Sequence, residues 1–272
     1  MDRSILTVPV QKVDGESSQP FQDLLAIEEP LEISIGEKPV SVTMRTPGHD
    51  FELAVGFLFT EGILQGADQI ASVGRSAGNV NPRQTANSVN VALTPGVEVD
   101  FDRLRRNFYT TSSCGVCGKA SIAAIEAQGC PVLPRNSLTV ESSVIHRLPD
   151  ALRREQATFD RTGGLHAAGL FDSVGNLLAL REDIGRHNAV DKLIGAEVLD
   201  SRTPLFNRLL LVSGRASFEL VQKALMAGIP ILAAVGAPSS LAVETAQRFN
   251  MTLLGFVRDG RFNIYSGASR IH

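Results

Sequence analysis

Two cysteines, Cys114 and Cys117, lie in the segment 110–119, which reads TTSSCGVCGK. A glycine follows each cysteine and four hydroxyl residues precede the pair, and these residue types disfavour both regular structure and core burial. We therefore expect the thiols on an exposed, mobile loop. An apolar-periodic segment that starts just after Lys119 predicts a helix there, and the partial positive charge at its N-terminus would favour the reactive thiolate.

A Cys-x-x-Cys pair is compatible with several kinds of site. A zinc site needs about four ligands, but the sequence has no second pair of this spacing, Cys130 precedes a proline, and the five histidines are scattered. A structural disulfide is disfavoured because nothing in the chain implies export, and cytosolic thiols stay reduced. Redox or sulfur-carrying chemistry fits the pair best. The alternative is that the two cysteines are ordinary small residues with no chemical role, in a loop that tolerates many residue types.

The bulk composition indicates a globular protein. The chain has 272 residues, of which 43% are hydrophobic, enough for one large domain or two smaller ones. A net charge of -3 gives no reason to expect DNA to bind across the surface, and the absence of tryptophan argues against a stacking platform for single strands. The N-terminal apolar run is too short for a secretory signal, and no stretch approaches ~18 apolar residues. We expect a cytoplasmic protein that binds neither nucleic acid nor membrane.

The first half of the chain predicts a small α+β domain. Residues 1–25 are polar and turn-rich, show no period, and are expected to form an extended tail. Alternating apolar residues within 31–44 predict a β-hairpin, and the dense apolar residues of 51–59 predict a buried helix. A strand at 88–93 and a short basic helix at 101–108 follow. We place this domain at residues 26–135, ending in the cysteine loop and its helix.

The second half, residues 136–272, predicts an α/β domain. A helix is expected near 149–160. A hairpin (165–171 and 177–180) then leads into alternating helices and strands, of which the strands 208–212 and 231–235 are continuous apolar runs typical of strands buried on both faces. The remaining elements are the helices 186–199, 216–227 and 239–249 and the strands 252–257 and 261–265. This order predicts a three-layer α-β-α sandwich.

Ligands of open α/β sheets bind beyond the carboxyl ends of the strands, where helix N-termini attract anions. Two such corners are Ser213-Gly214-Arg215 and residues 236–240, although ordinary helix caps would look the same. The polar loop 181–188, with Arg186 and His187, is either a ligand site or a solvated cap. His166 alone is more typical of a hydrogen-bonded core residue. The hairpin 256–261 offers two arginines and a glycine, but an Asp-Gly turn needs no ligand.

Four segments in order carry a family resemblance: TSSCGVCGK (111–119), GGLHAAGLF (163–171), EDIGRHNAVDK (182–192) and SGRASFE (213–219). With them the chain resembles the FdhD family of formate dehydrogenase accessory sulfurtransferases, over about residues 25–270. The resemblance implies that sulfur is accepted as a persulfide from a cysteine desulfurase. It also implies transfer to the bis(molybdopterin guanine dinucleotide) molybdenum cofactor before insertion into formate dehydrogenase, and a cytidine-deaminase-like fold for the C-terminal domain.

The resemblance also implies site residues. Cys114 matches the persulfide carrier of a sulfurtransferase, and Cys117 would assist or resolve the persulfide. The cofactor is then a bound substrate and no permanent metal is expected; the segment expected to bind it is Phe256, Val257, Arg258, Asp259, Gly260 and Arg261. The oligomeric state stays open, a homodimer included, and residues 1–25 lie outside the resemblance.

Three other functions compete with this one. A zinc nucleobase deaminase needs His-x-Glu ahead of Cys-x-x-Cys, whereas His166-Ala167-Ala168 lacks the acid and follows the cysteines. A non-catalytic chaperone that binds the molybdenum cofactor would not need the thiols. A thioredoxin-like oxidoreductase is disfavoured because the cysteine pair does not lie between the first strand and helix of a βαβ unit.

Overall fold

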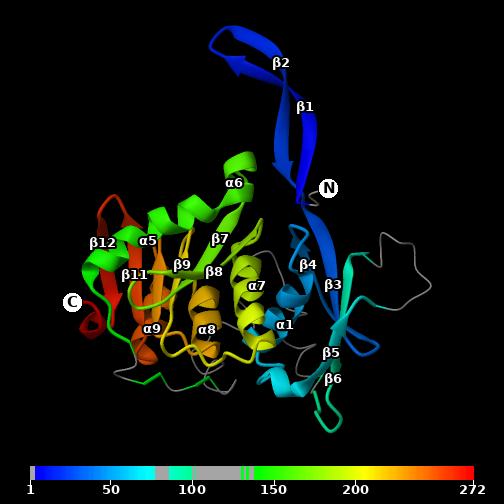
Figure 1. The fold of residues 1–272 in the computed structure, drawn as a ribbon, viewed down its shortest axis with the longest axis vertical. Coiled ribbons are helices and arrows are strands. Elements are labelled where there is room, and N and C mark those ends of the chain that lie inside the picture. The colour runs from blue at the N-terminus through cyan, green and yellow to red at the C-terminus, as the bar shows by residue number, and fades with distance from the viewer. Residues whose placement is uncertain (1–3, 77–85, 100, 102–129, 132, 135–137) are drawn as a thin grey trace.

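The computed structural model describes residues 4–76, 86–99, 101, 130, 131, 133, 134 and 138–272 (Figure 1). These residues form a two-stranded, a four-stranded and a six-stranded sheet with helices between and around them. Within the described ranges, no helix combines the length and the apolar character that a membrane span requires.

The six-stranded sheet has the order β12-β11-β10-β9-β7-β8. Its strands β9, β10 and β11 are parallel, whereas β7 runs antiparallel to both β8 and β9, and β12 runs antiparallel to β11. The strands are β7 (His166–Phe171), β8 (Leu177–Asp183), β9 (Leu209–Val212), β10 (Ile231–Ala234), β11 (Thr252–Arg258) and β12 (Arg261–Ser266).

Helices cover both faces of this sheet, because its central strands are apolar on both sides. Leu209 and Leu211 of β9 belong to the apolar cluster under α5 (Ser142–Glu155), whereas Leu210 and Val212 face the opposite cluster. The helices on that opposite side are α7 (Arg186–Leu199), α8 (Phe218–Met226) and α9 (Ser240–Arg248). The predicted α/β class and the order of elements from the β7–β8 hairpin onward are confirmed.

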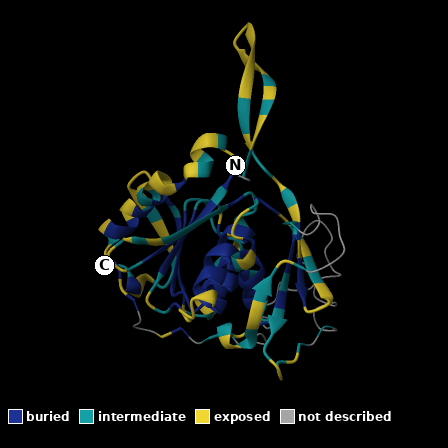
Figure 2. Ribbon diagram, turned by 45° about the vertical axis from the view of Figure 1, so that its right-hand side comes forward, coloured by how far each residue is buried: buried dark blue, intermediate teal, exposed yellow. Residues whose placement is uncertain are grey.

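The N-terminal half continues the packing outward from α7. Helix α1 (Asp50–Thr60) lies directly on α7, so close that a Cβ atom on Gly195 would come within 1.8 Å of the Glu52 carbonyl oxygen. Beyond α1 lies the four-stranded sheet β4-β3-β6-β5, and Figure 2 shows the central helices almost wholly buried. Its strands are β3 (Glu29–Ile35), β4 (Lys38–Arg45), β5 (Ile70–Gly74) and β6 (Ser88–Leu93). One apolar core therefore includes residues of both predicted domains.

Two buried ion pairs of the second half are hydrogen-bonded to the first half. The Lys192 ammonium lies 2.7 Å from Asp183 and donates to the Thr46 carbonyl at 2.8 Å. The Lys223 ammonium contacts both Asp191 oxygens at 2.9 Å and Thr60 Oγ1 at 2.9 Å. Burial acts to lower the pKa of Lys223, but the carboxylates of Asp191 and Glu61 outweigh it and raise that pKa. Lys223 is thus held charged inside the core.

The structure differs from the sequence-based expectations at several elements. Residues 1–25, expected as an unpatterned tail, instead supply most of a hairpin of β1 (Ile5–Asp14) and β2 (Ser17–Ala26), with Gly15 at positive φ in its turn. Because this hairpin projects into solvent on both faces (Figure 2), burial imposes little alternation on it. The helix expected near 149–160 is two helices, α5 and α6 (Ala157–Thr162), and Pro149 lies inside the first.

Shorter elements also departed from expectation or went unnoticed. Strand β5 was not predicted, since its five residues are too few to show a period. Two 3-10 helices, η1 (Ala67–Gln69) and η2 (Ala268–Arg270), complete the described elements. The predicted basic helix at 101–108 lies outside the described residues except for Phe101, as do residues 135–137 around the predicted domain boundary.

Candidate functional site

The predicted nucleophiles Cys114 and Cys117 lie outside the described residues. Cys130, the cysteine that the structure describes, is half-buried against the apolar core. Burial raises the pKa of its thiol to about 12, so the reactive thiolate is scarce at neutral pH. A nucleophilic role for Cys130 is therefore disfavoured by its surroundings.

The predicted corners lie together at the carboxyl edge of the six-stranded sheet. The Gly236 amide donates to the Gly214 carbonyl at 2.9 Å, and the Phe256 amide donates to the Gly236 carbonyl at 3.0 Å. A Cβ atom on Gly255 would lie 2.8 Å from Pro238 Cδ, so the close approach of these loops requires glycine there. The loops that follow β9 and β10 and the C-terminal part of β11 thus lie side by side in one continuous row along the carboxyl edge.

The segment Phe256–Arg261 forms the tip of the β11–β12 hairpin at one end of that row (Figure 1). Phe256 and Asp259 both have positive φ, 55° and 54°, a conformation that costs energy for residues other than glycine. Arg258 and Arg261 face each other in register and are exposed. The tip therefore presents two cations on a constrained backbone, an arrangement that can bind an anion.

The loop 181–188 divides into a structural part and a part at the sheet edge. The Asp183 carboxylate is fully buried and accepts the backbone N–H groups of Thr46 at 3.1 Å and Gly185 at 2.8 Å. The Asn188 amide nitrogen donates to the Met44 carbonyl at 2.7 Å. These two side chains fix the loop to the end of β4 and to the β4–α1 connection, and neither caps α7, whose N-cap is Gly185.

Arg186 and two histidines form the edge part. The Arg186 Nε atom is buried and has no hydrogen-bond partner among the described residues. Burial, Lys223 and Arg186 lower the pKa of His187 to about 4, and its Nε2 lies 3.3 Å from Ser217 Oγ. Burial and the nearby Arg186 charge also lower the pKa of His166. Burial and these neighbouring cations thus favour the neutral form of both rings at pH 7.

A cavity of about 530 Å³ opens beside this edge, between the sheet and helices α5 and α6. His166 and Ser213 line it on the sheet side, and Leu152 and Phe159 supply apolar wall. His166 was predicted as a core residue, and Phe159 was not predicted as a site residue because the sequence pattern does not separate α6 from α5. The two glycines at 163–164 could have indicated where α6 ends, since Gly163 is its C-cap and the chain then enters β7.

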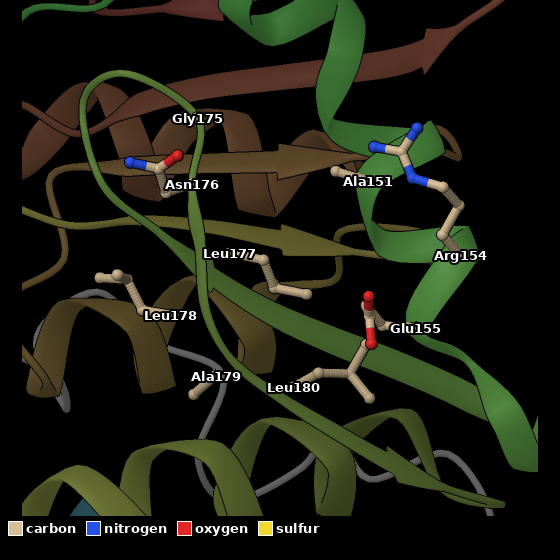
Figure 3. A pocket seen from close by; sticks show the side chains of 9 residues that line it. All are labelled: Ala151, Arg154, Glu155, Gly175, Asn176, Leu177, Leu178, Ala179 and Leu180. Carbon is tan, nitrogen blue, oxygen red and sulfur yellow. The ribbon is translucent and has the colours of Figure 1, made fainter.

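A second hollow of about 490 Å³ lies between α5 and the strand β8 (Figure 3). Its charged lining residues are Arg154 and Glu155, of opposite sign, and none of the predicted site residues borders it. We therefore place the candidate site at the carboxyl edge of the sheet. Among the described residues, no group of three or more His, Cys, Asp or Glu side chains is arranged to hold a metal ion.

Comparisons with a family model and with individual proteins all indicate the same family. A model described as the FdhD/NarQ family matches residues 26–272. Proteins named "Sulfur carrier protein FdhD" are similar: one from Mycobacterium tuberculosis is 53% identical over 253 residues, covering 92% of each chain. One from Streptomyces coelicolor is 52% identical over 251 residues, covering 92% of this chain and 89% of its own. One from Sulfolobus acidocaldarius is 40% identical over 267 residues, covering 98% of each.

A solved structure supports the fold. A chain from Desulfotalea psychrophila, described as a formate dehydrogenase accessory protein, has a TM-score of 0.76 and covers 98% of this chain and 99% of its own. Its sequence identity is 24%, so the likeness concerns architecture. The family match begins at residue 26, where β2 ends, so almost all of the β1–β2 hairpin lies outside the matched region.

Proposed function

Because the chain belongs to the FdhD/NarQ family, we propose that it is a sulfur carrier that serves the maturation of formate dehydrogenase. The observation that carries the proposal is the match over residues 26–272, together with relatives about 50% identical that are named sulfur carriers. In the finer form of the proposal, sulfur comes from a cysteine desulfurase. It then goes to the bis(molybdopterin guanine dinucleotide) molybdenum cofactor, which is cargo and not a resident group.

The proposed sulfur transfer uses the two cysteines of the segment 110–119. The Cys114 thiolate attacks the terminal sulfur of the desulfurase persulfide, a new S–S bond forms on Cys114, and the desulfurase thiolate leaves. Cys117 then attacks the Cys114 sulfur, which forms a disulfide between the two and releases hydrosulfide to the molybdenum of the cargo. Two equivalents of a cellular thiol reduce that disulfide before the next cycle and are themselves oxidised to a disulfide. Cys130 takes no part, since burial keeps its thiol protonated.

The cargo is proposed to lie along the carboxyl edge of the six-stranded sheet. Arg258 and Arg261 of the segment 256–261 contribute exposed guanidinium groups, whose planar donor geometry suits phosphate oxygens. The edge also collects helix N-termini, which favour anionic groups. A diphosphate-containing dinucleotide cargo fits this chemistry better than a neutral metabolite would.

Mass spectrometry after incubation with a cysteine desulfurase and L-cysteine tests the sulfur step. We expect the mass of one sulfur atom on the peptide that contains Cys114. The Cys114→Ala variant should lose it, and the matched control Cys130→Ala should keep it. Loading that survives in Cys114→Ala but not in Cys117→Ala would reverse the two roles. Formate dehydrogenase activity that survives in a Cys114→Ser, Cys117→Ser strain would favour the chaperone function instead.

A further inference from the structure

Helix α6 borders the cavity of about 530 Å³ without being part of the apolar core. None of its six residues is buried, whereas α5, which lines the cavity next to it, buries four. Phe159 of α6 and Leu152 of α5 both contribute to the cavity wall. Most helices are held in place by an apolar face packed on the core. Helix α6 has no such face and is therefore held by other contacts.

A carboxylate of the sheet holds the start of α6. The Glu182 oxygens accept the backbone N–H groups of Thr158 at 3.1 Å and Phe159 at 2.9 Å. The N-cap residue of the helix, Gln156, makes no capping bond with its own side chain. Glu182 belongs to β8 and lies more than twenty residues later in the chain. It thus takes the place of a local cap and joins the helix to the sheet.

The other contacts of α6 are exposed to solvent. Asp160 pairs with Arg153 of α5, but the two side chains are 51% and 50% exposed, so solvent screens the pair. The Arg153 guanidinium also lies 4.5 Å from the centroid of the Phe159 ring. Figure 1 shows α6 beyond the end of α5, next to the base of the β1–β2 hairpin, whose strand β2 it contacts. The charge-assisted bonds to Glu182 are thus the strongest of these attachments.

Two glycines follow the helix directly. Gly163 is its C-cap, with φ of 65°, a conformation that favours glycine. Gly164 has no such reason to be glycine, since its φ is not positive and a Cβ atom on it would lie 3.6 Å from Ala26 Cβ, an ordinary van der Waals distance. Its effect is to leave the backbone free to change conformation there. The pair is therefore suited to act as a hinge.

We propose that α6 is a lid of this cavity, held closed by Glu182 and hinged at Gly163 and Gly164. When the two bonds to Glu182 break, the helix moves away from the sheet and takes Phe159 out of the cavity wall. The inference rests on the proposed function, because the organic part of the cargo is the ligand that the lid would admit and cover. Glu182 is a positioning residue, since it contacts the helix and not the ligand.

Amide hydrogen exchange of the full chain tests the lid without a ligand. We expect the Thr158 and Phe159 amides to exchange about tenfold faster or more in Glu182→Gln, because one carboxamide oxygen replaces two carboxylate oxygens. The matched control Glu244→Gln changes an exposed acid of α9 and should leave these rates unchanged. Unchanged rates in Glu182→Gln would overturn the proposal. So would wild-type α6 amides that exchange only when the whole protein unfolds.

Stopped-flow binding of a fluorescent derivative of GDP, which contains the guanine and one diphosphate of the cargo, tests the gating. A lid controls both entry and exit, so Glu182→Gln should raise the association and dissociation rate constants together, by about threefold or more. Gly164→Ala fits sterically but restricts the hinge, and it should lower both constants. An association rate constant that is the same in all three proteins would show a fixed wall and contradict the proposal.

These outcomes are separate from those of the proposed function. Sulfur loading of Cys114 is measured by mass spectrometry, and its failure would overturn the sulfur step alone. Failure of GDP to bind would overturn the assigned cargo, and the hydrogen exchange of α6 in the free protein would still decide whether the helix opens.

Discussion

The segment 182–192 has charged side chains that are fully paired on its inner side and a charged side chain that is incompletely paired at the sheet edge. On the inner side, the Lys192 and Asp183 side chains are 2% and 0% exposed and pair at 2.7 Å, with further bonds to the backbone of Thr46. On the sheet edge, Arg186 is half-buried, and its Nε has no hydrogen-bond partner among the described residues. The first arrangement satisfies its charges within the protein, whereas the second leaves a donor for something else.

This difference separates a residue's contribution to folding from its contribution to binding. A buried pair with all its partners present is costly to break, because the remaining charge stays buried. An unsatisfied donor at an edge contributes little to folding, but it can gain a partner from a ligand. One short motif therefore connects the two halves of the chain and also presents a donor, Arg186 Nε, that has no hydrogen-bond partner among the described residues.

Removal of the Lys192 charge should have the largest effect on stability. In Lys192→Met, Asp183 remains buried with backbone and amide donors but no cation, and the Thr46 carbonyl loses a donor. We expect a loss of about 3–5 kcal/mol in the free energy of unfolding, measured with urea. Adding Asp183→Asn removes the stranded charge and should recover part of the loss. A change below ~1 kcal/mol in the single variant would show that this pair does not hold the halves together.

Glu52 tests an intermediate case, since its side chain is 20% exposed and its partner His49 is more exposed still. Burial acts to raise the pKa of Glu52, but hydrogen bonds from His49 and Arg181 outweigh it and lower that pKa from 4.5 to about 2. A carboxylate with a lowered folded pKa stabilises the protein above its unfolded pKa, and this stabilisation is lost as the pH falls toward the folded value.

Acid titration of stability therefore separates the wild type from Glu52→Gln. Between pH 5 and pH 2 the wild type should lose on the order of 2 kcal/mol more than the variant, after allowance for solvent screening. Urea unfolding at several pH values, with both proteins in the same buffer series, measures the difference. Parallel curves for the two proteins would mean that Glu52 gains nothing from His49 and Arg181.

The sequence predicted the elements of the second half well because their partners are close in the chain. Helix α7 has the predicted bounds 186–199, and β9 and β10 each differ from prediction by one residue. These strands are buried on both faces, so their apolar runs are unbroken. The hairpin β1–β2 gave no such signal, since both its faces meet solvent, and α5 was misplaced because Pro149 lies inside the helix rather than at its start.

The site was only partly predictable because the partners of its residues are far away in the chain. The sequence identified the loop 181–188 and the corner at Gly214 as candidates, but it could not assign separate roles within the loop. The partners that make Asp183 and Asn188 structural are Thr46 and Met44, more than a hundred residues earlier in the chain. Likewise, His166 lies at the carboxyl edge of the sheet only because β7 runs antiparallel to β9. The first residue of β7 therefore lies beside the C-terminal end of β9.

Arg186→Met should have the smallest effect on stability and thereby sharpens the contrast with Lys192→Met. Both variants replace a cation of the same helix by the same side chain. Because Arg186 Nε has no partner to lose, we expect the free energy of unfolding to change by less than about 0.5 kcal/mol. The pKa of His166 should rise, since a neighbouring positive charge is gone, and NMR titration would record it. A loss comparable to that of Lys192→Met would place Arg186 among the structural charges, and the unsatisfied donor would then no longer indicate a ligand.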